Sequence, residues 1–193
     1  MYKSNNVVYC DSIGNSEVIV RYPQNGDVEA MLKYINAISK EKTYITWQGE
    51  EISLKHEQIY LKNQLKRIKK NETVQLLLFV NSELSGISAI DLGERIKSHI
   101  GVFGITIAQK YHGKGFGKLL MKLILEEASR GLSKLKMITL EVFAENEKAI
   151  KMYKNFGFIQ YGKLPKGNLY KGKLVDDIQM YKNVEINQSD SNV

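Results

Sequence analysis

The spacing of apolar residues predicts two amphipathic helices in the first half of the chain. Apolar side chains recur three or four positions apart in residues 28–40, directly after Asp27, which can cap a helix. The same spacing recurs in residues 54–70. Residues 17–22 form a short strand candidate, and the polar residues 1–16 before it predict a loose N-terminal arm.

The middle of the chain changes to strand-like segments joined by short turns. Residues 73–80, 86–91 and 99–108 are rich in β-branched and apolar side chains, and their short links predict an antiparallel meander. Further helices are predicted at 116–131 and 145–156, and further strands at 137–143, 158–161 and 174–181. The fold class that follows is α+β (α/β), with a mixed and mostly antiparallel sheet.

Length and composition fit one domain, predicted over residues 17–183, with a polar C-terminal tail at 184–193. The chain has 193 residues, of which 43% are hydrophobic. No apolar stretch is long enough to span a bilayer and no signal peptide is apparent, so we expect a cytoplasmic protein without membrane contact. Cys10 is the only cysteine, which argues against a disulfide and a metal site.

The net charge of +7 has two interpretations: it attracts an anionic ligand, or it only makes the protein surface more soluble. No nucleic-acid motif accompanies the charge, so we do not expect a nucleic-acid partner. The sequence leaves open whether the protein forms a homodimer.

A glycine-rich loop follows the strand candidate 99–108 and precedes the helix 116–131. Glycine lets the backbone turn tightly, and the free N–H groups of a helix start bind phosphate oxygens. The alternative is a strand-to-helix turn without a ligand. The residues of this candidate site are His112, Gly113, Lys114, Gly115, Phe116, Gly117 and Lys118.

Two other phosphate-binding patterns fit this loop less well. A Walker loop requires a Ser or Thr after its Lys, and Leu119 follows Lys118 here. The dinucleotide pattern G-x-G-x-x-G matches Gly113 and Gly115 but has Lys118 in its third glycine position. Because of this partial match to the dinucleotide pattern, a nucleotide-binding oxidoreductase remains an alternative.

A second segment carries Asn146, Ala149, Tyr153, Gly157 and Phe158. The first three of these residues lie three and seven positions apart and share one face of the helix 145–156. On its own this face is as compatible with core packing and a capping asparagine as with a ligand contact.

Together the two segments resemble the GNAT superfamily of N-acetyltransferases, whose members carry a Q/R-x-x-G-x-G/A loop and a later N-x-x-A-x-x-x-Y-x-x-x-G-F segment. The second pattern is matched completely. The first is matched at Gly115 and Gly117, with His112 in place of Arg or Gln. The resemblance spans most of the chain. It implies a sheet that splays between strands 99–108 and 137–143, with acetyl-CoA as co-substrate in the split.

The resemblance also implies roles for single residues. The loop 112–118 would hold the pyrophosphate. The backbone of Ile105, Thr106 and Ile107 and the side chain of Asn146 would hold the pantetheine arm. Tyr153 would protonate or hydrogen-bond the leaving sulfur, and Glu141 is a candidate base.

The implied function is acetyl transfer to a primary amine of a protein N-terminus, a lysine or a small molecule. A non-catalytic CoA sensor on the same fold is a further alternative.

Overall fold

The computed structural model describes residues 6–184, and the chain divides into two compact units. The first unit comprises residues 6–91 and 104–132, and the second comprises residues 92–103 and 133–184. The boundary between them falls within strand β5 (Ile100–Ile107), which contributes its first half to the second unit and its second half to the first.

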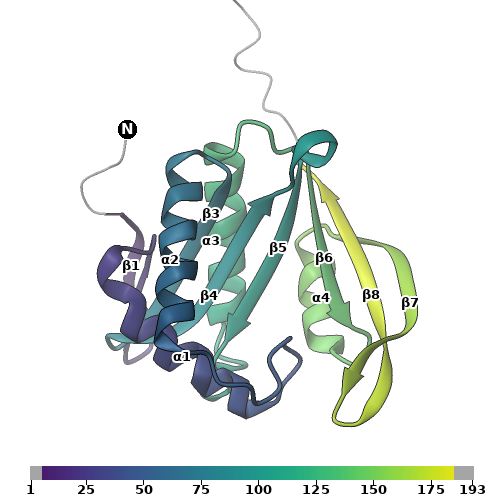
Figure 1. Cartoon of the computed structure of the whole chain (residues 1–193), viewed down its shortest axis with the longest axis horizontal. Helices are drawn as coiled ribbons and strands as arrows, with labels where there is room; N and C mark the ends of the chain where they lie inside the picture. The colour runs from purple at the N-terminus through teal and green to yellow at the C-terminus, as the bar shows by residue number, and fades with distance from the viewer. Residues whose placement is uncertain (1–5, 185–193) are drawn as a thin grey trace, which may run out of the picture. The chain divides into compact units, whose positions relative to one another are not determined.

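The first unit is built on antiparallel strands that pair in the order β1-β2-β3-β4. Strand β3 is buried along nearly its whole length because helices cover both of its faces, as Figure 1 shows for α2 in front and α3 behind. Leu77 of β3 packs with Leu61 of α2, whereas a Cβ at Gly131 of α3 would lie 3.7 Å from Val74, on the other face. The strands are β1 (Val7–Ile13), β2 (Ser16–Arg21), β3 (Thr73–Val80) and β4 (Glu83–Leu92).

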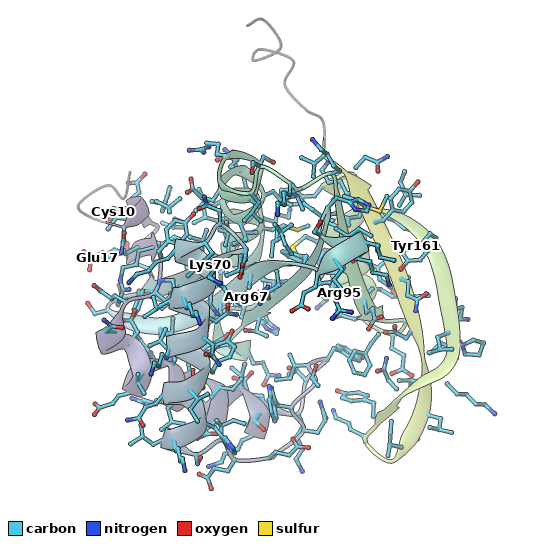
Figure 2. All side chains as sticks on the ribbon, turned by 45° about the horizontal axis from the view of Figure 1, so that its top comes forward. Cys10, Glu17, Arg67, Lys70, Arg95 and Tyr161 are labelled. Carbon is cyan, nitrogen blue, oxygen red and sulfur yellow. The ribbon has the colours of Figure 1, made fainter. Side chains whose placement is uncertain are left out.

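Three helices of this unit form as the apolar spacing predicts: α1 (Val28–Glu41), α2 (Leu54–Lys69) and α3 (Phe116–Gly131). Met31, Tyr34 and Ile38 lie on one face of α1 and are buried against α2 and β3. Figure 2 shows Arg67 and Lys70 at the C-terminal end of α2, where positive charge interacts favourably with the helix dipole.

The second unit combines a parallel and two antiparallel strand pairs. Strand β5 runs parallel to β6 (Met137–Phe143), and their register covers Ile100–Val102 against Met137–Thr139. Strand β6 pairs antiparallel with β8 (Lys173–Asn183), and β8 pairs with β7 (Ile159–Tyr170) in a long hairpin. Helix α4 (Glu147–Asn155) follows β6 along the chain (Figure 1).

The predicted mixed and mostly antiparallel sheet is confirmed, and the bounds of β3, β6 and α3 are those expected from the sequence. Two segments differ. The expected arm 1–16 contains β1, which forms a hairpin with β2. Residues 162–170, which separate the predicted strands 158–161 and 174–181, are also strand and belong to β7. Both β1 and β7 are largely exposed edge strands, so neither has the apolar alternation that marks a half-buried strand. Most of the predicted tail, residues 185–193, lies outside the described residues.

Within residues 6–184, no helix is long and apolar enough to cross a membrane. The same residues contain no group of three or more His, Cys, Asp or Glu side chains that could hold a metal ion.

A mostly buried ion pair joins the end of β2 to the start of α1. The Arg21 guanidinium donates to both carboxylate oxygens of Asp27, at 2.6 and 2.7 Å, and the backbone N–H of Gln24 donates to the same carboxylate. We expect Asp27→Asn to lower the free energy of unfolding by about 3 kcal/mol, because it leaves the guanidinium buried without its counterion.

Urea denaturation measures this change. The matched control is Glu51→Gln in the exposed pair Lys40–Glu51, which should cost less than about 1 kcal/mol. Equal changes in the two variants would contradict a special contribution from Asp27.

Candidate active site

The glycine loop between β5 and α3 leaves the start of α3 open. Gly113 and Gly115 have φ angles of +77° and +89°, which L side chains rarely adopt, and Gly115 is the residue before the first helical position. No side chain caps this helix, and the first intrahelical bond runs from the Leu119 N–H to the Gly115 carbonyl. The N–H groups of the first three helical residues, Phe116, Gly117 and Lys118, therefore have no intrahelical acceptor.

Three contacts hold this loop in place. The Phe116 side chain is 2% exposed, and its ring meets the Tyr111 ring edge-on at 5.6 Å. His112 Nε2 lies 2.8 Å from the Ile107 carbonyl oxygen, so this nitrogen carries a proton and donates it to the end of β5. The Glu41 carboxylate accepts from the Gln109 N–H at 3.1 Å. The sequence gives no signal for Glu41, which lies 68 positions away from its partner.

Positive charge near the loop is distributed unequally. The ammonium group of Lys110 donates to Glu83 at 2.6 Å, and this hydrogen bond raises the pKa of Lys110. Lys114 and Lys118 are exposed, and the Lys114 Nζ lies 5.4 Å from the centre of the Tyr111 ring. The loop thus offers open N–H groups and two exposed cations, which suits a phosphate-bearing ligand.

The second half of β5 contains the predicted pantetheine contacts Ile105, Thr106 and Ile107. The Tyr34 hydroxyl donates to Thr106 Oγ1 at 3.0 Å, and burial raises the pKa of Tyr34, which keeps the hydroxyl protonated. The Ile107 carbonyl is already bound by His112. The role of these three residues toward a ligand stays a prediction.

In the second unit, the residues of the asparagine–tyrosine segment have distinct structural roles. Asn146 caps α4, with its side-chain oxygen accepting from the Ala149 N–H at 3.3 Å. Gly157 follows the helix with a φ angle of +85°, and the Phe158 N–H bonds back to the Tyr153 carbonyl. The capping alternative therefore accounts for the Asn146 oxygen, and the amide nitrogen is the group left for the predicted ligand contact.

Tyr153 is held in an aromatic cluster of this unit. It is 8% exposed, and its ring lies 5.9 Å from that of Phe103 and 6.2 Å from that of Phe158. Burial raises the pKa of Tyr153 to about 12. Its hydroxyl forms no hydrogen bond with another residue of the described range 6–184, so it is a donor without an internal acceptor.

Glu141 lies on the opposite face of β6 from Ile138 and Leu140, and its side chain is exposed. Phe103 is two positions after Gly101, so both lie on one face of β5, and Gly101 is in register with Ile138 of β6. The ring of Tyr153 packs against Phe103, so this aromatic cluster lies on the Ile138 face. The structure thus brings Tyr153 together with Phe103 and Phe158 but places Glu141 on the other face of the same strand.

Several known proteins are similar to this chain. The acetyltransferase (GNAT) family matches residues 34–158. An L-amino acid N-acetyltransferase of Escherichia coli is 33% identical over 107 residues, which are 55% of this chain and 65% of that enzyme. A spermidine N(1)-acetyltransferase of Vibrio cholerae is 26% identical over 171 residues, which are 86% of this chain and 93% of that enzyme.

The crystal structure of a GNAT-family acetyltransferase from Streptococcus pneumoniae is also similar, with a TM-score of 0.80 and 26% identity. The match covers 88% of this chain and all of that one. The chain spans less than two thirds of the amino acid enzyme but nearly all of the spermidine enzyme and of the streptococcal protein.

These similarities confirm the predicted fold and the acetyltransferase class, with acetyl-CoA as donor, and they overturn the oxidoreductase alternative. The matched range 34–158 is more than half of the chain and contains both the glycine loop and the segment from Asn146 to Phe158. The chain therefore belongs to the acetyltransferase (GNAT) family.

Proposed function

We propose that this protein acetylates a primary amine of a small acceptor with more than one positive charge, of the polyamine class. The supporting observation is the similarity to a spermidine acetyltransferase along 93% of that enzyme. An amino acid is the second candidate acceptor, supported by the higher identity to the amino acid enzyme over a shorter range.

The loop is suited to the donor substrate. The open N–H groups of Phe116, Gly117 and Lys118 can donate to pyrophosphate oxygens, and Lys114 adds positive charge. A Cβ at Gly113 or Gly115 would meet no atom within 4 Å, so the positive φ angles, rather than lack of room, require glycine here. The Asn146 amide and the backbone of β5 are the groups proposed to hold the pantetheine arm.

The chemistry requires that an ammonium group lose a proton before its nitrogen attacks the thioester carbonyl. One proton of the ammonium group is released to solvent and one ends on the leaving sulfur, so the products are the amide and the free thiol. Glu141 is exposed on the other face of β6 from Tyr153 and is proposed to take the released proton through water.

Tyr153 is proposed to donate a hydrogen bond to the sulfur. A phenol with a pKa of about 12 is a far weaker acid than a thiol with a pKa of about 8.5, so net transfer from Tyr153 alone is uphill. Tyr153 therefore stabilises the developing thiolate by a hydrogen bond. It gives its own proton to the sulfur only when a second proton replaces the one that it loses.

Acetyl-CoA turnover against a panel of amines tests the acceptor. We expect CoA release with spermidine to exceed release with free amino acids and N-terminal peptides. Release with amino acids alone would favour the second candidate. If calorimetry shows CoA binding but no amine increases release, the CoA-sensor alternative gains support instead.

The loop conformation is tested by Gly115→Ala. A side chain at a φ angle of +89° costs about 1–2 kcal/mol, and we expect the Kd for CoA to rise by about tenfold. Calorimetry gives the Kd. Gly26→Ala is the matched control, because Gly26 is outside the positive-φ range and has open space around its Cβ position. An unchanged Kd in folded Gly115→Ala would contradict the proposed phosphate site.

Tyr153→Phe should lower kcat by about 100-fold, with little change in the KM for acetyl-CoA, because only the hydroxyl is removed. The control is Tyr161→Phe, whose side chain is 58% exposed on β7 (Figure 2).

The pH profile gives a second measurement of the same residue. The raised pKa keeps the phenol protonated up to about pH 12, so tyrosine ionisation should cause no loss of kcat below about pH 10. A loss of kcat centred near pH 10 that disappears in Tyr153→Phe would contradict this role.

A further inference from the structure

One face of the second unit carries polar and aromatic side chains that the proposed chemistry uses only in part. Glu141 is opposite Gln179, and Phe143 is opposite Asp177, in the antiparallel pairing of β6 with β8. Residues two apart share a face of a strand, so these four side chains lie on the same face. We call them the Asp177 face.

Asp177 is a buried carboxylate without a cation. It is 7% exposed, and its Oδ1 accepts from the Asn168 side-chain amide at 3.0 Å. No Lys, Arg or His of residues 6–184 forms an ion pair with it, whereas the neighbouring Asp176 binds the Lys163 ammonium at 2.6 Å and the Lys166 N–H at 2.9 Å. A buried charge without a counterion is costly, so a cation at Asp177 would be stabilised.

An irregularity of β7 lies beside the buried Asp177. The register of β7 with β8 shifts between Leu164 and Asn168, and this bulge lies against Asp177. A Cβ on Gly167 would come within 3.0 Å of both the Asp177 Cβ and the Leu164 side chain. The backbone of Gly167 thus lies close to the Asp177 Cβ, and the carboxylate has a side-chain amide rather than a cation as its partner.

Two aromatic rings, those of Phe143 and Tyr170, lie on the Asp177 face. The Phe143 and Tyr170 rings pack edge-on at 5.3 Å, and the Tyr170 side chain is buried. The Lys171 ammonium lies 4.9 Å from the centre of the Tyr170 ring, so one alkylammonium group already rests on this aromatic surface. Glu141 is diagonal to Asp177 across the two strands, and residues in this relation usually lie roughly 7 Å apart, measured between their backbones.

We propose that Asp177 binds an ammonium group of the acceptor other than the one that is acetylated, with Phe143 and Tyr170 beside it. This inference rests on the proposed function and specifies its acceptor. Diamines and polyamines carry the second ammonium group that the site requires. Monoamines lack it, and the carboxylate of an amino acid is repelled by Asp177 and Glu141.

The test compares two acceptors of matched length, 1,4-diaminobutane and n-butylamine, in wild type and Asp177→Asn. The asparagine keeps the shape of the side chain and an oxygen that can accept from Asn168. We expect kcat/KM for the diamine to fall by roughly tenfold to hundredfold, mainly through KM, and that for butylamine to change by less than about twofold. Asp176→Asn, which removes a carboxylate that already has its cation, should leave the ratio between the acceptors unchanged.

An unchanged ratio in Asp177→Asn overturns the proposal. So does an equal loss for both acceptors together with a lower unfolding temperature, because that result assigns Asp177 to anchoring the β7 bulge. Calorimetric titration of 1,4-diaminobutane into the CoA-saturated protein gives a readout that needs no turnover. If wild type acetylates neither amine, the proposed function fails, and loss of diamine binding in Asp177→Asn still decides the role of Asp177.

Discussion

The unpaired N–H groups at the start of α3 are the feature on which the rest of the loop structure depends. A helix start without a capping side chain is stable only if water or a ligand accepts these N–H groups. Here the two neighbouring glycines have positive φ angles, Phe116 is buried, and His112 and Glu41 bind the backbone on the strand side of the loop. These contacts hold the strand side of the loop in place, and the N–H groups at the helix start are left without a capping side chain.

Much of the fold could be predicted because its long elements are amphipathic or buried. Helix α3 is a clear example, since its glycine start and its apolar face define the bounds that the structure confirms. Strand β1 and residues 162–170 of β7 could not be predicted in this way, because their side chains are largely exposed on both faces and show no regular apolar alternation. Their pairing depends on the neighbouring strand, which the local sequence does not reveal.

The candidate site was predictable where its residues act through local backbone structure. Asn146, Gly157 and the glycines of the loop fall into this group, because a helix cap and a left-handed turn are encoded within a few positions. Residues that act through distant contacts were not predictable. Asp176 and Asp177 are adjacent and chemically identical, yet one is paired with Lys163 and the other is buried without a cation, because successive side chains point to opposite faces of a strand.

The two substrates proposed for this enzyme have opposite charges, and the chain meets them with separate groups. The net charge of +7 favours the phosphates of the donor, and the exposed Lys114 and Lys118 concentrate that charge beside the open helix start. A polycationic acceptor is repelled by the same net charge at long range, but salt screens this repulsion beyond about 10 Å. Within that distance the nearest charges decide, and on the face of β6 and β8 these include the carboxylates of Glu141 and Asp177. A basic protein can therefore select a basic acceptor, provided that the carboxylate it uses forms no ion pair with its own lysines, as holds for Asp177 among residues 6–184.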